Sequence, residues 1–118
     1  MKKLTQKEEE ILACFWQHGP MFIRELLEIQ DDPKPHYNTL STIVRTLEEK
    51  EYIAYNAYGN TYQYYALISE GEYRNLTLNT VVDKYFGHSY KRVVSSLIEE
   101  EKLSIDELQE LIDKIKNK

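Results

Sequence analysis

The sequence predicts a mainly α-helical fold with one small β-hairpin. Three amphipathic helical segments come first, and an uncharged, tyrosine-rich segment that turns at a glycine follows them. The last 43 residues carry further apolar helical stripes, in a stretch close to the size below which a chain rarely holds a core alone. This order describes a winged helix-turn-helix domain, predicted over residues 1–70, with a helical dimerisation region over residues 71–118.

The first two helices are predicted from their caps and their apolar spacing. Thr5 and Glu8 form a T-x-x-E capping box, in which each side chain accepts a free backbone N–H of the other residue. Apolar residues then recur at helical spacing until Gly19-Pro20 ends the first helix. A second helix is expected over residues 23–30, where the DDPKP sequence stops it because prolines cannot continue a helix.

A third helix is expected over residues 36–50, within the sequence PKPHYNTLSTIVRTLEEK. Its apolar residues lie three and four positions apart, which predicts one buried face made of Leu40, Ile43, Val44 and Leu47. Glu, Lys and Gln are better helix formers than Asn, Ser and Thr, yet the opposite face holds the hydrogen-bonding residues Asn38, Ser41 and Thr42, together with Arg45. Residues 33–47 contain two basic and no acidic residues in a chain of net charge −5. This face therefore predicts a negatively charged partner.

The hairpin is predicted over residues 52–69, which contain no charged residue. Aromatic and β-branched residues flank Gly59-Asn60, the pattern of two strands joined by a tight turn. Six tyrosines in this segment could also stack on bases of a single strand, but ordinary sheet packing is the favoured interpretation.

The tail is predicted to form three helices. Capping boxes at residues 69–72 and 104–107 open the first and the last, Ser89 caps the middle one, and Gly87 ends the first. Their apolar stripes must be buried, either on the first domain or on a second copy, and the sustained periodicity favours a two-fold homodimer. The residues expected at the dimer contact are Val82, Tyr85, Phe86, Val93, Val94, Leu97, Ile98, Leu108, Leu111, Ile112 and Ile115.

Composition excludes several classes of protein. The single cysteine, Cys14, rules out an internal disulfide and is expected in the core. His18, His36 and His88 lack the spacing of metal ligands, and no catalytic motif is present, so we expect no enzyme, no metal and no cofactor. The N-terminus is no signal peptide and no apolar run could cross a bilayer, which predicts a cytoplasmic protein without direct membrane binding.

Several segments resemble the penicillinase-repressor family of bacterial transcriptional repressors. They include LTQKEEEILACFWQHGPMFIRELLE, PHYNTLSTIVRTLEEK, YQYYALIS and YFGHSYKRVVSSLIEEEKLSIDELQELI, so the resemblance runs from residue 4 to the C-terminus. It implies a winged-helix dimer that binds a palindromic double-stranded operator and blocks antibiotic-resistance genes. Other members control copper transport genes through a C-terminal cysteine cluster, which this chain lacks.

The resemblance also implies which residues contact DNA. The family's recognition helix falls on residues 36–50, where Asn suits adenine, Arg suits guanine or a phosphate, and Thr methyls suit thymine. Hydroxyl groups near a helix start commonly hold phosphates, and a lysine just before the helix is placed for the DNA backbone. The expected contacts are Lys34, His36, Tyr37, Asn38, Thr39, Ser41, Thr42, Arg45 and, on the hairpin, Asn60.

Three departures from the family pattern have physical consequences. Glu51 stands where the family usually has glycine, so the end of the third helix is expected to run on or to be strained. The hairpin has no Lys or Arg, which predicts a weaker salt dependence of DNA binding. The resistance repressors of the family are inactivated by proteolysis at an Asn-Phe bond after a membrane sensor detects the antibiotic. The matching bond here is Ser96-Leu97, which is chemically different, so cleavage is expected to be affected.

An alternative hypothesis is a winged-helix protein-interaction module without DNA binding. The formal charge of residues 1–75 is −4, and the hairpin offers no cation to a phosphate. A continuous non-negative face across the third helix and the hairpin is the feature that distinguishes a DNA-binding protein from such a module.

Overall fold

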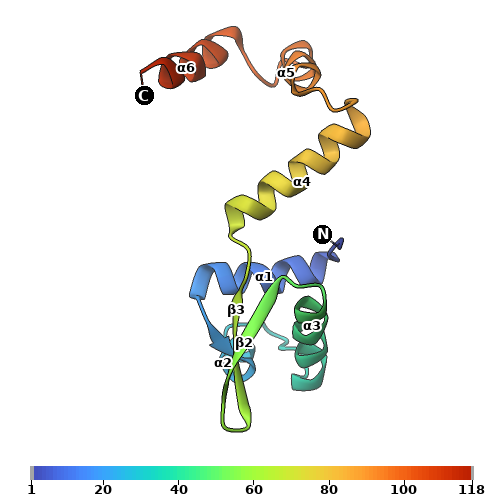
Figure 1. The fold of residues 1–118 in the computed structure, drawn as a ribbon, viewed down its shortest axis with the longest axis vertical. Coiled ribbons are helices and arrows are strands. Elements are labelled where there is room, and N and C mark those ends of the chain that lie inside the picture. The colour runs from blue at the N-terminus through green and yellow to red at the C-terminus, as the bar shows by residue number, and fades with distance from the viewer. Residues whose placement is uncertain (1, 118) are drawn as a thin grey trace. The chain divides into compact units, whose positions relative to one another are not determined.

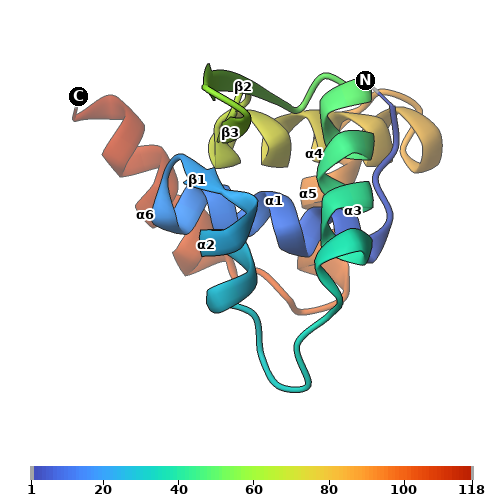
Figure 2. The same ribbon diagram turned by 90° about the horizontal axis from the view of Figure 1, so that it is seen from below.

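The computed structural model describes residues 2–117 and divides the chain into two compact units, Met1–Tyr73 and Arg74–Lys118. Figures 1 and 2 show the elements. In chain order they are α1 (Gln6–His18), β1 (Met21–Phe22), α2 (Ile23–Glu28), α3 (Tyr37–Glu49), β2 (Ile53–Tyr58), β3 (Thr61–Ala66), α4 (Glu70–Tyr85), α5 (Tyr90–Glu99) and α6 (Ile105–Lys116). The predicted mainly α-helical class with a winged helix is confirmed.

The wing belongs to a three-stranded antiparallel sheet of order β1-β3-β2, so the expectation of a two-stranded hairpin was incomplete. The missing strand is β1, which pairs Met21 with Tyr64 and Phe22 with Gln63. A strand of two residues is too short to show the alternation of apolar and polar residues by which a strand is recognised in a sequence. The hairpin itself turns through Gly59-Asn60, and Gly59 has φ 62, as the first position of a type II′ turn requires.

The core of the first unit lies between the three helices and the inner face of the sheet. The predicted capping box is present, with the Thr5 N–H donating to Glu8 Oε1 over 2.8 Å and the Glu8 N–H donating to Thr5 Oγ1 over 3.2 Å. In both views α3 crosses α1 at a steep angle (Figures 1 and 2). The best-buried core side chains of this unit are Ile11, Leu12, Leu26, Leu40, Val44, Leu47 and Ile53.

The end of α3 is closed by a left-handed residue that is not glycine. Glu51 has φ 67, while its N–H donates to the Glu48 carbonyl and the Tyr52 N–H donates to the Leu47 carbonyl. These bonds are those of a Schellman cap, whose left-handed position favours glycine. The strained helix end expected from Glu51 is therefore present.

Two interactions hold α3 and the wing onto α1. The Lys50 ammonium, at the end of α3, donates to Glu8 Oε1 over 2.8 Å and to the Lys3 carbonyl over 3.0 Å. The indole N–H of Trp16 donates to the Ile68 carbonyl, just beyond β3, over 2.8 Å. Both interactions join residues more than forty positions apart in the chain. They therefore fix the positions of α3 and the wing relative to α1.

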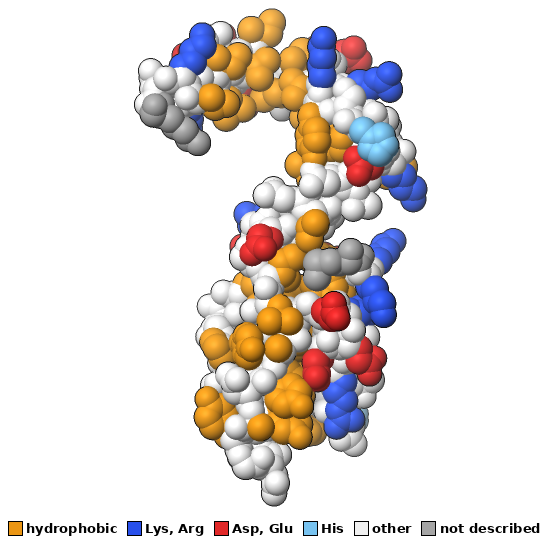
Figure 3. All heavy atoms as spheres, viewed as in Figure 1, with side chains coloured by type: hydrophobic (Ala, Val, Ile, Leu, Met, Phe, Trp, Pro, Cys, Tyr) orange, Lys and Arg blue, Asp and Glu red, His pale blue; other side chains and the backbone are white. Residues whose placement is uncertain are grey.

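The second unit consists of amphipathic helices with their predicted caps. Ser89 Oγ accepts the Arg92 N–H, and Ser104 and Glu107 form a reciprocal capping box. Hydrophobic side chains gather on the visible face of α5 and α6 (Figure 3). None of the helices within residues 2–117 is long and apolar enough to cross a membrane.

The predicted dimer contacts differ in exposure. Val82 has 0 % of its surface exposed, because it lies one turn before the end of α4, where the chain folds back and the His88 N–H donates to its carbonyl. It has no exposed surface in the single chain, so the structure does not favour its assignment to the dimer contact, which stays a prediction. Half-buried members are Phe86, Val93, Val94, Ile98 and Leu108. Exposed members are Tyr85, Leu97, Leu111, Ile112 and Ile115.

Candidate nucleic-acid interface

The outer face of α3 presents polar side chains to solvent. Tyr37 is 51 % exposed, and Asn38, Thr39, Thr42 and Arg45 are exposed as well. The Thr42 hydroxyl donates to the Asn38 carbonyl over 2.9 Å, which occupies its hydrogen within the helix. Thr42 therefore offers a methyl group and oxygen lone pairs to a partner, while the side chains of Asn38 and Arg45 offer N–H donors.

Ser41 does not belong to this exposed face. Only 7 % of its surface is exposed, and it lines a hollow between α3 and the sheet. A helical projection gives the direction of a side chain but not how closely the rest of the fold approaches it. Little of the Ser41 side chain is open to a base edge, so the structure does not favour its assignment as a direct contact, which stays a prediction.

Lys34 has a structural role that the sequence did not reveal. Its ammonium donates to the Glu28 carbonyl over 2.8 Å and to the Gln30 carbonyl over 2.7 Å, which satisfies free acceptors at the end of α2. Two of its three N–H donors are thus occupied within the chain. A contact between Lys34 and a phosphate could use only the third N–H donor.

The start of α3 is open to an anion. His36 occupies the N-cap position without a side-chain hydrogen bond, and the first turn contains no acidic residue. The first backbone N–H groups of a helix have no partner within it, and the helix dipole places partial positive charge there. A phosphate is the kind of group that such an end accommodates.

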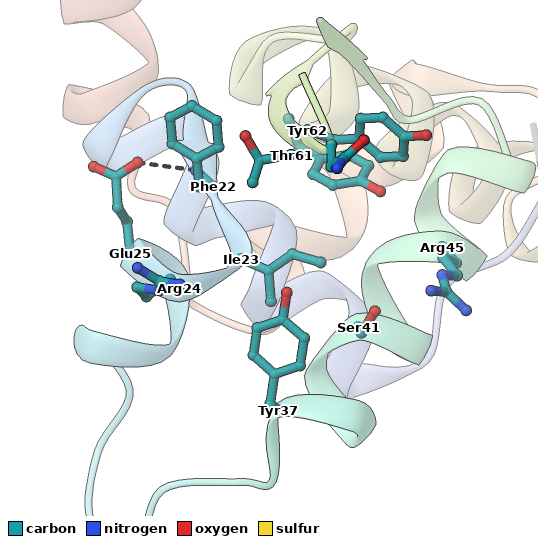
Figure 4. A pocket seen from close by; sticks show the side chains of 11 residues that line it. Phe22, Ile23, Arg24, Glu25, Tyr37, Ser41, Arg45, Thr61 and Tyr62 are labelled. Atoms are coloured by element: carbon teal, nitrogen blue, oxygen red, sulfur yellow. Dashed lines mark hydrogen bonds between the residues drawn. The ribbon is translucent and has the colours of Figure 1, made fainter. Parts of the chain in front are cut away.

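A hollow of about 530 Å³ lies between α2, α3 and the wing (Figure 4). Phe22, Ile23 and the tyrosine rings of α3 and β3 supply its apolar lining. Arg24 on α2 and Arg45 on α3 stand toward opposite sides of it in this view. Arg24 is not among the contacts expected from the sequence. Its only signal in the sequence is that it is the one cation of α2, where it stands beside Glu25.

Neither guanidinium is neutralised locally. Among residues 2–117, neither Arg24 nor Arg45 forms an ion pair with a carboxylate. Glu25 also lines the hollow, but its carboxylate accepts the Phe22 N–H over 3.0 Å. Residues 33–47 hold no acid, but α3 ends in Glu48 and Glu49, and Glu49 is exposed one turn beyond Arg45. The part of α3 from its start to Arg45, together with the two arginines, is therefore the part of this side that can receive an anion.

The wing contributes polar and aromatic groups but no cation. The Tyr55 and Tyr62 rings stack at 4.3 Å between centroids, and Tyr64 packs against both. Burial raises the pKa of the Tyr64 hydroxyl and Glu48 adds to the rise, while Arg45 acts in the opposite direction. Asn60 is exposed at the turn, and it lines the same hollow as Arg45.

The other predicted sites lie away from this face. Cys14 is half-buried on α1, where its thiol donates to the Glu10 carbonyl over 3.4 Å. The described residues contain no group of three or more His, Cys, Asp or Glu side chains that could hold a metal ion. Ser96 and Leu97 lie inside α5, so the bond between them is part of a helix.

The fold and this face define a winged helix-turn-helix protein with an appended helical region. The chain belongs to the penicillinase repressor family, whose model matches residues 4–117, and is thereby a member of a family of transcriptional repressors. It is 26 % identical over 112 residues to the methicillin resistance regulatory protein MecI of Staphylococcus aureus strain N315, covering 92 % of this chain and 89 % of that protein. It is also 26 % identical over 112 residues to the penicillinase repressor of Staphylococcus aureus, covering 94 % and 89 % respectively.

Proposed function

We propose that this protein is a homodimeric transcriptional repressor that binds a palindromic operator by inserting α3 of each subunit into the major groove. The exposed polar face of α3, which has no acid between Tyr37 and Leu47, an open N-terminus and an Arg45 without an ion pair among the described residues, is the observation that carries the proposal. The names of its relatives, a methicillin resistance regulator and a penicillinase repressor, favour genes of antibiotic resistance as the target.

Each exposed group on this face has a role that its chemistry suits. Asn38 can bond adenine through both its amide atoms, and the Thr42 methyl can contact the methyl of thymine. Arg45 bonds guanine or a phosphate. The helix start, with His36, Tyr37 and Thr39, holds a phosphate, and Asn60 holds another from the wing.

The second unit supplies the dimer contact in this proposal. Its exposed apolar side chains on α4, α5 and α6 remain uncovered in the single chain, which is the usual mark of an interaction surface. Two-fold symmetry would place the two recognition helices one helical turn of DNA apart, about 34–36 Å, or a multiple of that spacing.

The experiment that tests the reading face is Arg45→Ala, with Arg92→Ala in the second unit as a matched control. Loss of a base or phosphate contact by a free guanidinium should weaken operator binding by about 1–3 kcal/mol, or roughly 5- to 150-fold. The dimer should stay intact in both variants, and the control should bind as tightly as the parent. An Arg45→Ala protein with unchanged operator affinity would remove Arg45 from the interface.

A protein-interaction module without DNA binding is the second candidate. The charge of −4 over residues 1–75 and the wing strands without a cation favour it. An intact dimer that binds no duplex DNA even at low salt would support this function over the repressor.

Inactivation by a membrane sensor-protease system belongs to the same proposal. The Ser96-Leu97 bond lies within α5, so a protease would have to unwind that helix to reach it. Replacing both residues with alanine should abolish cleavage in cells exposed to a β-lactam, and because Leu97 is also an expected dimer contact, Leu97→Ala alone serves as the control for operator binding. Cleavage at another bond would exclude this site.

A further inference from the structure

The hollow beside α3 has the size and lining of a small-molecule site. Its volume of about 530 Å³ lies within the range of roughly 300–1,000 Å³ that ligand pockets occupy. Phe22, Ile23 and Tyr62 provide apolar surface, and Figure 4 shows Tyr37 standing beside Ile23 and Ser41. A DNA backbone laid across α3 would need the polar rim of this hollow, but its apolar interior has no part in that contact.

The charges at the hollow select the type of ligand. Arg24 and Arg45 come from different helices and form no ion pair among the described residues, so each has donors available to an anion. A guanidinium fork matches a carboxylate bidentately. The aromatic lining favours a flat ring on the same molecule. A doubly charged phosphate would lose more hydration in such surroundings than a singly charged carboxylate.

We propose that this hollow binds a small aromatic carboxylate, and that the bound ligand and operator DNA exclude each other. The exclusion rests on the proposed DNA-binding function, because Tyr37, Arg45 and Asn60 line the hollow and are also proposed DNA contacts. Coupling of two binding events is reciprocal, so the ligand lowers operator affinity by the same factor by which the operator lowers ligand affinity. The site makes the repressor responsive to a metabolite without cleavage of the chain.

The ligand site is tested without DNA, by titrating the ¹⁵N-labelled full-length protein with 2-naphthoate and following the backbone amide signals by NMR. We expect saturable shifts that cluster in residues 22–25, 37–45 and 60–64. The uncharged analogue 2-naphthamide should bind at least tenfold more weakly, because it lacks the charge-assisted hydrogen bonds. Arg24→Gln should weaken 2-naphthoate binding by roughly tenfold or more, whereas Arg92→Gln in the second unit should leave it unchanged.

Exclusion is tested by repeating operator titrations with 2-naphthoate present. The apparent Kd for the operator should rise in proportion to one plus the ratio of ligand concentration to ligand Kd. Shifts confined to the second unit, or Arg24→Gln binding as well as the parent, would overturn the site. Saturable binding in the hollow with unchanged operator affinity would overturn the exclusion. If the protein binds no operator at all, the proposed function fails by itself and the DNA-free titration still decides the ligand site.

Discussion

The ion pair between Glu8 and Lys50 should contribute about 2 kcal/mol to the stability of the first unit, and Glu8→Gln isolates that contribution. Lys50 Nζ lies 2.8 Å from Glu8 Oε1 and 3.2 Å from Oε2, and the two side chains are only 8 % and 21 % exposed. Glutamine still closes a capping box. The glutamine side chain carries no charge, however, and its NH₂ group takes the place of Glu8 Oε2, where it faces the Lys50 ammonium donor to donor.

The magnitude follows from what Lys50 loses. A hydrogen bond to a charged group contributes roughly 1.5–3 kcal/mol, and one-sided loss of a fully buried pair costs about 3–5 kcal/mol. Lys50 keeps its hydrogen bond to the Lys3 carbonyl and some contact with water. The expected cost therefore lies in the range for a single charged hydrogen bond, at about 2 kcal/mol.

The pH dependence gives a second signature. Burial raises the pKa of Glu8, but the hydrogen bonds from Lys50 and the Thr5 backbone and the Lys50 charge outweigh it, so the pKa lies below its ordinary value of 4.5. A lowered folded pKa means that the stabilisation is present above pH 4.5 and is lost as the pH falls through the folded pKa. The difference between the parent and Glu8→Gln should therefore shrink in acid.

Urea unfolding followed by Trp16 fluorescence reports on the first unit alone, because the chain has one tryptophan. At pH 7 the midpoint of Glu8→Gln should fall by roughly 1–2 M. Glu9→Gln is the matched control on the exposed side of α1, and its midpoint should stay near that of the parent. Equal midpoints for the two variants at pH 7, or a gap that does not change with pH, would refute the reasoning.

Three further outcomes are expected. Glu51→Gly should raise the free energy of unfolding by about 0.5–1 kcal/mol, because glycine adopts φ 67 without strain, and a lower urea midpoint would contradict this. Trp16→Phe should cost at least about 1 kcal/mol in unfolding followed by circular dichroism, since the Ile68 carbonyl loses its donor, and an unchanged midpoint would show that water replaces the indole. Leu111→Asp should convert the protein to monomers in sedimentation experiments and weaken operator binding, and an intact dimer would exclude α6 from the contact.

Local chemistry was predictable from the sequence. The capping pairs at residues 5–8 and 104–107 form as expected, because the groups that bond lie three positions apart. The apolar spacing of α3 placed that helix within one residue at each end. The absence of glycine after Lys50 correctly predicted the strain at Glu51. Each of these features depends on residues that are neighbours in the chain.

Features that depend on distant residues were missed. Strand β1 exists only because β3, forty residues later, pairs with it. Ser41 is buried although it falls on the polar face of α3, and Lys34 turns back to the carbonyl groups at the end of α2. Periodicity within one helix does not report contacts with distant residues, so neither the burial of Ser41 nor the hollow beside α3 was predicted from the sequence.

Fluorescence anisotropy on duplex DNA from the region upstream of the protein's own gene tests the central claim most directly. The full-length protein is titrated at two salt concentrations, with scrambled duplex as competitor. We expect binding that survives the competitor and weakens as salt rises, with a shallow slope because the wing displaces few cations. An intact dimer that fails to bind this duplex at low salt would contradict the assignment of α3 as a DNA-reading helix.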